Sequence, residues 1–194
     1  SDDVNDYHRI AYIKNAQISW KTGKLTLTGG MISTIQFNMQ EKFWGYRYIM
    51  KSFQDQYKFG SSADLGISAS YKFTDWLTAD AIVVNGEGYK KIQKNDGLMY
   101  GLGATLTPLK GLSMRIYYGL NETTDPTKEN KQNLATFIGY KGKGFSIGSE
   151  YSLYKNDGNI KGNDLYGFSV YGSVKASKST DIYARYDNLS SKDD

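Results

Sequence analysis

Apolar and polar residues alternate along most of the chain, most regularly on either side of the turn at residues 107–111. Every second residue there is apolar, namely Leu98, Tyr100, Leu102, Ala104, Leu106, Leu112, Met114, Ile116, Tyr118 and Leu120. The residues that alternate with them are small or polar, with Arg115 as the one charge, namely Gly101, Gly103, Thr105, Ser113, Arg115, Tyr117 and Gly119. Because strand side chains point alternately to two faces, this pattern predicts a β-hairpin with one apolar and one polar face.

The same alternation predicts ten strands in all. They are expected near residues 15–21, 25–31, 63–73, 77–83, 98–106, 112–120, 134–140, 145–153, 166–174 and 182–186. Short turns near positions 75, 109, 143 and 178 recur about every 34–35 residues, whereas long polar segments (38–61, 85–97 and 121–133) join the strands at the other end. Short turns at one end and long loops at the other are typical of outer-membrane barrels, whose tilted strands need about 9–11 residues.

Composition narrows the class of protein. The 194 residues include 17 Tyr and 21 Gly but only 2 Pro, which favours an all-β chain, and no run approaches the roughly 18 apolar residues of a membrane-spanning helix. The net charge of +4 arises from scattered residues, so no nucleic-acid partner is expected. With no Cys and His8 as the single His, the sequence predicts no metal site, no cofactor and no catalytic group.

Alternation alone leaves two architectures open. A soluble β-sandwich or closed barrel has the same pattern, with the apolar face as its core. The polar face, however, holds mainly Gly, Ser, Thr and Tyr, and the apolar face becomes aromatic near the strand ends, as membrane interfaces favour. We therefore expect residues 1–194 to form one domain, an antiparallel up-and-down transmembrane β-barrel.

Strand parity predicts which side chains line the lumen of such a barrel. The pore-lining candidates are Lys21, Asp64, Lys72, Asp80, Arg115, Tyr117, Glu150, Arg185 and Asp187, and parity adds Lys141 and Asp181. The charges in this set are balanced, so opposite charges are expected to pair across neighbouring strands. The wall alone then gives no strong charge preference.

The long segment 38–61 is the strongest candidate for a functional element. It carries Lys42, Arg47, Lys51 and Lys58 among several aromatic residues, against Glu41 and Asp55. One interpretation is a loop folded into the lumen, where these cations form a pore constriction that favours anionic solutes. Arg47 is then the expected main contributor, because its planar fork suits phosphate and carboxylate groups. The alternative is an external loop whose aromatic residues cap its neighbours.

Four short motifs, in order along nearly the whole chain, resemble porins of Gram-negative anaerobes, which are related to the phosphate-selective porin superfamily. They are Phe43-Trp44-Gly45-Tyr46-Arg47-Tyr48, Phe59-Gly60-Ser61-Ser62-Ala63-Asp64-Leu65-Gly66, Asn85-Gly86-Glu87-Gly88-Tyr89 and Arg185-Tyr186-Asp187-Asn188. The resemblance implies a passive diffusion channel in the cell outer membrane, usually of about 16 strands. Its implied partners are outer-membrane lipid, small polar or anionic solutes and further copies of the chain, as in a trimer.

The chain departs from that family pattern in two respects. It carries about ten strands, and it ends in Ser190-Ser191-Lys192-Asp193-Asp194 rather than in an aromatic strand. We therefore expect an internal portion of a larger barrel. The functional alternatives are a non-conducting barrel that acts as an anchor or receptor and, more remotely, a barrel enzyme.

Overall fold

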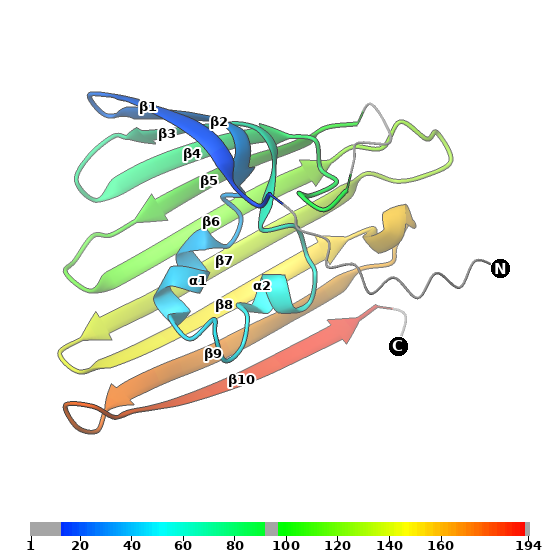
Figure 1. Cartoon of the computed structure of the whole chain (residues 1–194). Helices are drawn as coiled ribbons and strands as arrows, with labels where there is room; N and C mark the ends of the chain where they lie inside the picture. The colour runs from blue at the N-terminus through cyan, green and yellow to red at the C-terminus, as the bar shows by residue number, and fades with distance from the viewer. Residues whose placement is uncertain (1–12, 92–96, 193–194) are drawn as a thin grey trace, which may run out of the picture.

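Ten β-strands form one antiparallel sheet in the computed structural model, which describes residues 13–91 and 97–192 (Figure 1). Each strand pairs with its neighbours in sequence, from β1 to β10. The bounds are β1 (Ala16–Thr22), β2 (Leu25–Ser33), β3 (Ala63–Lys72), β4 (Leu77–Val84), β5 (Met99–Leu106), β6 (Leu112–Asn121), β7 (Lys131–Gly142), β8 (Phe145–Lys155), β9 (Leu165–Lys175) and β10 (Asp181–Ser191). The predicted all-β, up-and-down arrangement is confirmed. His8, Asp193 and Asp194 lie outside the described residues.

The two ends of the sheet differ in their connections, as the spacing of turns predicts. At one end the hairpins are tight, and β7 and β8 are joined by Lys143 and Gly144 alone. Gly144 has a φ of 84°, a conformation that glycine adopts without the steric penalty of a side chain. At the opposite end lie the connections 34–62, 85–98, 122–130 and 156–164, the last with a short 3₁₀ turn, η1 (Asp157–Asn159).

The pairing register places apolar residues together on one face of the sheet. Leu102, for example, is paired with Ala81 on one side and Tyr118 on the other. The residues predicted for this face, Leu102, Met114, Ile116, Ile147 and Val170, are 37–65% exposed. Those predicted for the opposite face include Arg115, Tyr117, Glu150 and Ser169, all at most 6% exposed. The predicted division into two faces is confirmed, and the apolar face is the exposed one.

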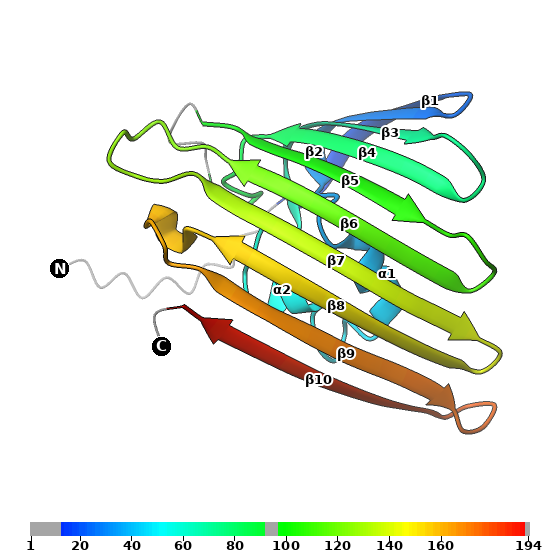
Figure 2. The ribbon, with the colours of Figure 1, turned by 180° about the vertical axis from the view of Figure 1, so that it is seen from behind.

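The segment between β2 and β3, residues 34–62, lies across the polar face (Figure 1). We call it the covering segment, the face beneath it the covered face and the opposite one the bare face. Figure 2 shows the bare face with no element over it. The segment contains α1 (Asn38–Trp44) and α2 (Phe53–Gln56), so the predicted loop 38–61 includes two short helices. These helices were missed because each is too short to show a helical period.

The sheet is open. Among the described residues, β1 and β10 each pair with a single neighbour and form the two edges. No helix within residues 13–91 and 97–192 has the length and apolar character needed to cross a membrane. The hydrophobic cores are small, and each lies between the covering segment and the covered face rather than on the bare face.

Candidate functional site

A buried network of amides and hydroxyls joins the covering segment to the middle of the sheet. Gln54 Nε2 of α2 donates to Ser152 Oγ of β8 at 2.9 Å and to Asn133 Oδ1 of β7 at 3.2 Å. Asn133 Nδ2 donates to the carbonyl of Phe59 at 2.9 Å, and Gln36 Nε2 donates to Gln54 Oε1 at 2.6 Å. Because buried polar groups are costly when unpaired, this network fixes the segment in one position.

Aromatic side chains of α1 fill hollows that glycines leave in the covered face. Phe43 packs edge-on against Phe137 of β7, with ring centroids 5.0 Å apart. A Cβ atom added at Gly139 or Gly148 would lie 2.5 Å and 3.0 Å from the Phe43 ring. Glycine at these two positions is therefore what admits the ring to the surface of the sheet.

Arg115 of β6 joins three parts of the structure. Its guanidinium donates to both carboxylate oxygens of Asp80 on β4, at 2.7 and 2.8 Å, and to Thr105 Oγ1 at 2.8 Å. It also donates to the carbonyl of Ile35 in the covering segment at 2.8 Å. Opposite charges of the covered face do pair here, although β4 and β6 are not neighbours and the pair spans β5. This ion pair holds the start of the segment.

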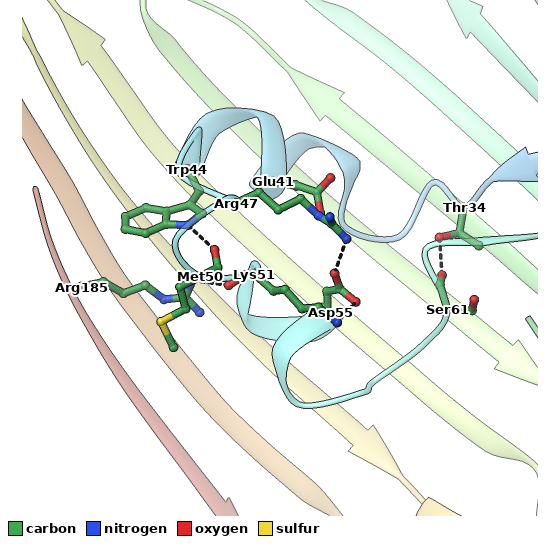
Figure 3. A network of polar contacts seen from close by, with 9 residues as sticks. All are labelled: Thr34, Glu41, Trp44, Arg47, Met50, Lys51, Asp55, Ser61 and Arg185. Atoms are coloured by element: carbon green, nitrogen blue, oxygen red, sulfur yellow. Dashed lines mark hydrogen bonds and ion pairs between the residues drawn. The ribbon is translucent and has the colours of Figure 1, made fainter. Parts of the chain in front are cut away.

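Arg185 of β10 holds the middle of the segment (Figure 3). Two of its nitrogens donate to the carboxylate of Asp187, both at 2.7 Å, and a third donates to the carbonyl of Lys51. Its guanidinium lies over the Trp44 ring, 5.3 Å from the centroid, where a cation is attracted to the π face. Trp44 in turn donates to the carbonyl of Met50 at 2.8 Å.

Arg47 joins the two helices of the segment to each other. It donates to Glu41 of α1 and, at 2.8 Å, to Asp55 of α2 (Figure 3). Partial burial disfavours the cation, but the hydrogen bond and charge of Glu41 and then the charge of Asp55 raise the pKa of Arg47 above its ordinary value. With two carboxylates beside it, Arg47 is a structural brace, and less of its charge is available to a solute than the sequence suggests.

Two hollows flank the covering segment. One, of about 560 Å³, lies between α1 and strands β4–β7, and Lys42, Lys141, Asp80 and Arg115 are among its lining residues. The other, of about 170 Å³, lies near the ends of β4 and β7 beside residues 58–61. It is lined by Lys58, Lys91 and Lys131 together with Asp64 and Glu87. Lysines from the segment and from the sheet therefore meet at both hollows.

The remaining predicted residues are spread over the sheet. Lys21 is exposed on edge strand β1, and Lys72 pairs with Asp75 in a turn at 2.7 Å. Asp64 has no cation as partner in the described part of the chain; instead it accepts backbone N–H groups of Leu65, Gly86 and Gly88. Tyr117 and Glu150 are buried on the covered face. Lys51 makes a looser ion pair with Asp55, at 3.6 Å.

The uncharged residues that hold the covering segment on the sheet were not predicted from the sequence. Gln36, Gln54, Asn133 and Ser152 form the buried network but carry no charge and no motif. The available signal was parity, because Ser152 falls on the polar face predicted for its strand. Asn133 falls in the predicted loop 121–133, since β7 begins three residues earlier than expected. Within residues 13–91 and 97–192, no group of His, Cys, Asp and Glu could hold a metal ion.

No protein-family model matches the chain, and no curated protein matches it. The resemblance to porins therefore stays an expectation from short motifs, and function has to be argued from the two faces of the sheet.

Proposed function

We propose that the chain forms part of the wall of an outer-membrane channel for passive diffusion of small polar or anionic solutes, narrowed by the covering segment. The observation that carries this proposal is that the sheet exposes its apolar face and buries its polar face. Apolar side chains cover the bare face from β1 to β10, while charged and amide side chains are enclosed on the covered face. A contiguous apolar surface of this kind is unfavourable in water and suits a lipid environment.

The distribution of aromatic residues supports the same proposal. Exposed aromatic residues lie near the tight turns, namely Tyr71, Phe73, Trp76, Tyr140 and Phe145, and toward the long connections, namely Tyr100, Tyr118 and Tyr166. Tyr186, expected near the long connections, lies in the middle of β10. Tyr and Trp prefer the two membrane–water interfaces, because their rings are apolar and their tips are polar. The residues between these two bands are mostly aliphatic or small, as expected for the hydrocarbon region.

The open edges imply further strands. Unpaired backbone N–H and C=O groups at β1 and β10 would be unfavourable in lipid, where no water can satisfy them. We propose that strands from elsewhere in a longer protein, or from another copy, complete a barrel of about 16 strands. The covering segment would then lie in its lumen.

Conductance in planar bilayers tests the channel directly. Purified protein, in its full-length form where the chain is longer, should give discrete ohmic current steps. A folded barrel that stays silent would instead favour an anchor or receptor, for which the close packing of the segment is the supporting observation. Turnover of a lipid or peptide substrate would favour an enzyme.

We expect a weak anion preference that depends on the lysines of the two hollows rather than on Arg47. Lys58→Gln combined with Lys131→Gln removes two cations from the smaller hollow, which lowers the local anion concentration. The reversal potential under a salt gradient should shift toward cation preference, and the shift should shrink at high salt. Lys110→Gln combined with Lys178→Gln, in the exposed turns after β5 and β9, removes the same charge as a control and should leave the potential unchanged. Cation preference in the unmodified protein would contradict this proposal.

Displacing Phe43 should widen the channel. Gly148→Val places side-chain atoms where Phe43 and Tyr171 now lie within about 3 Å of the position of an added Cβ, so α1 has to move away from the sheet. We expect a higher single-channel conductance and weaker ion selectivity. Gly29→Ala, whose added Cβ makes only ordinary contacts on the bare face, with Ile67 at 3.6 Å and the Gly66 carbonyl at 4.0 Å, is the control. Equal conductance of the two variants would show that the segment does not limit the current.

A further inference from the structure

Glu150 of β8 is enclosed between the sheet and the covering segment. Its side chain is 2% exposed, and neither carboxylate oxygen has a hydrogen-bond partner among the described residues. The Tyr171 hydroxyl of β9 and the backbone N–H of Phe53 in α2 approach the carboxyl group without completing a hydrogen bond. An ionised carboxylate at this position has lost its hydration, and no complete hydrogen bond replaces it.

The charged side chains near Glu150 do not neutralise the negative charge that its ionised carboxylate would carry. Those that act on it belong to Arg185 and Asp187 of β10, which have opposite signs. Arg185 is fully engaged, since two nitrogens bind Asp187 and the third binds the carbonyl of Lys51. The residues directly across from Glu150 on the neighbouring strands are Phe137 and Ser169, which carry no charge. Within the described residues, Glu150 therefore has neither a hydrogen-bond partner nor a cation of its own.

The covering segment is the lid over this site. Phe53 is fully buried, and a Cβ added at Gly167 of β9 would lie 2.7 Å from its ring, so α2 rests directly on the sheet beside Glu150. Gln40 and Ser52, also of the segment, are buried with side-chain polar atoms that lack a partner among the described residues. Lifting the segment would hydrate these polar atoms together with Glu150.

We infer that Glu150 is a protonation switch for the covering segment, which docks over the neutral carboxyl group and is released when that group is ionised. As the pH rises, Glu150 gives its proton to water, the uncompensated charge requires hydration, and the segment leaves the covered face. As the pH falls, the segment docks again. The effect on conduction rests on the proposed channel, whereas the movement of the segment does not.

Trp44 reports the position of the segment. Its ring is 3% exposed, against 58% for Trp20 and 47% for Trp76, so a variant with Trp20→Phe and Trp76→Phe leaves only the buried indole. In lipid vesicles, its emission should shift to the red and become quenchable by iodide between about pH 5 and about pH 9, above the ordinary carboxyl range. Adding Glu150→Gln, a neutral side chain of the same shape, should keep the emission blue throughout. Glu122→Gln, on the connection after β6, is the control and should retain the transition.

A second variant separates the switch from a merely structural role. Asp187→Asn removes the partner of Arg185 and leaves that cation to compensate Glu150, so the segment should stay docked to higher pH. Infrared spectra at about pH 6, where exposed carboxyl groups are ionised, should also show a protonated carboxyl band that Glu150→Gln lacks. Docking at every pH in the unmodified protein would overturn the inference, and so would release at the same pH in Glu150→Gln. If the covering segment moves with pH but no ionic current is measured, the switch stands and the channel proposal fails. If ionic current is measured but the segment does not move with pH, the channel proposal stands and the switch fails.

Discussion

Replacing Arg115 with methionine is expected to destabilise the folded protein by roughly 3–5 kcal/mol, the range typical of breaking a buried ion pair. The guanidinium side chain is 4% exposed and the Asp80 carboxylate 13%, so the substitution leaves a nearly buried charge without a partner. It also leaves the Ile35 carbonyl without its donor, which frees the start of the covering segment. Urea unfolding in lipid vesicles, followed by tryptophan fluorescence, measures the change.

Two further variants make this test specific. Combining Arg115→Met with Asp80→Asn removes the stranded charge and should restore part of the lost stability, because the two residues act as one unit. Lys72→Met breaks the exposed pair with Asp75, and no measurable change is expected there. A stability of Arg115→Met equal to that of the unmodified protein would show that the pair does not hold the sheet and the segment together.

Ile116→Arg should destabilise the protein in lipid by roughly 2–4 kcal/mol if the position lies near the bilayer midplane. Ile116 projects from the middle of β6 onto the bare face and is half exposed, so in water an arginine there would meet solvent at little cost. The expected loss therefore depends on a lipid environment, and urea unfolding in vesicles measures it.

The matched control is Ser113→Arg, on the same strand but on the covered face, where the hollow of about 560 Å³ gives the new side chain room. It should be tolerated better than Ile116→Arg. If Ile116→Arg has full stability in vesicles, the bare face does not contact hydrocarbon, and the membrane proposal fails.

The strands could be predicted from the sequence because their signal is local. Alternation at Leu102, Ile116 and Val170 fixes the face of each strand, and glycine-containing turns such as Lys143–Gly144 fix where strands end. Which of the two faces of the sheet is buried could also be predicted. The polar face carried too few charged side chains for a surface in water, and it is the buried one.

The docking of the covering segment could not be predicted in the same way. Gln54 contacts Ser152, 98 positions away, and Arg185 contacts Lys51, 134 positions away; no local pattern encodes such a pairing. The charges of Arg47 and Lys51 were visible, but not that Glu41 and Asp55 would fold back on them. Glu150 was identified by parity, yet its isolation depends on the segment above it.

The long-range anchoring of the covering segment has a consequence for the order of folding. Its anchor points lie on β6, β7, β8 and β10, all of which follow it in the chain, so it cannot dock until nearly the whole sheet has formed. Contacts so distant in sequence are entropically expensive to close and form late. Burial of Trp44 should therefore be the slowest fluorescence phase of refolding, after the sheet is complete.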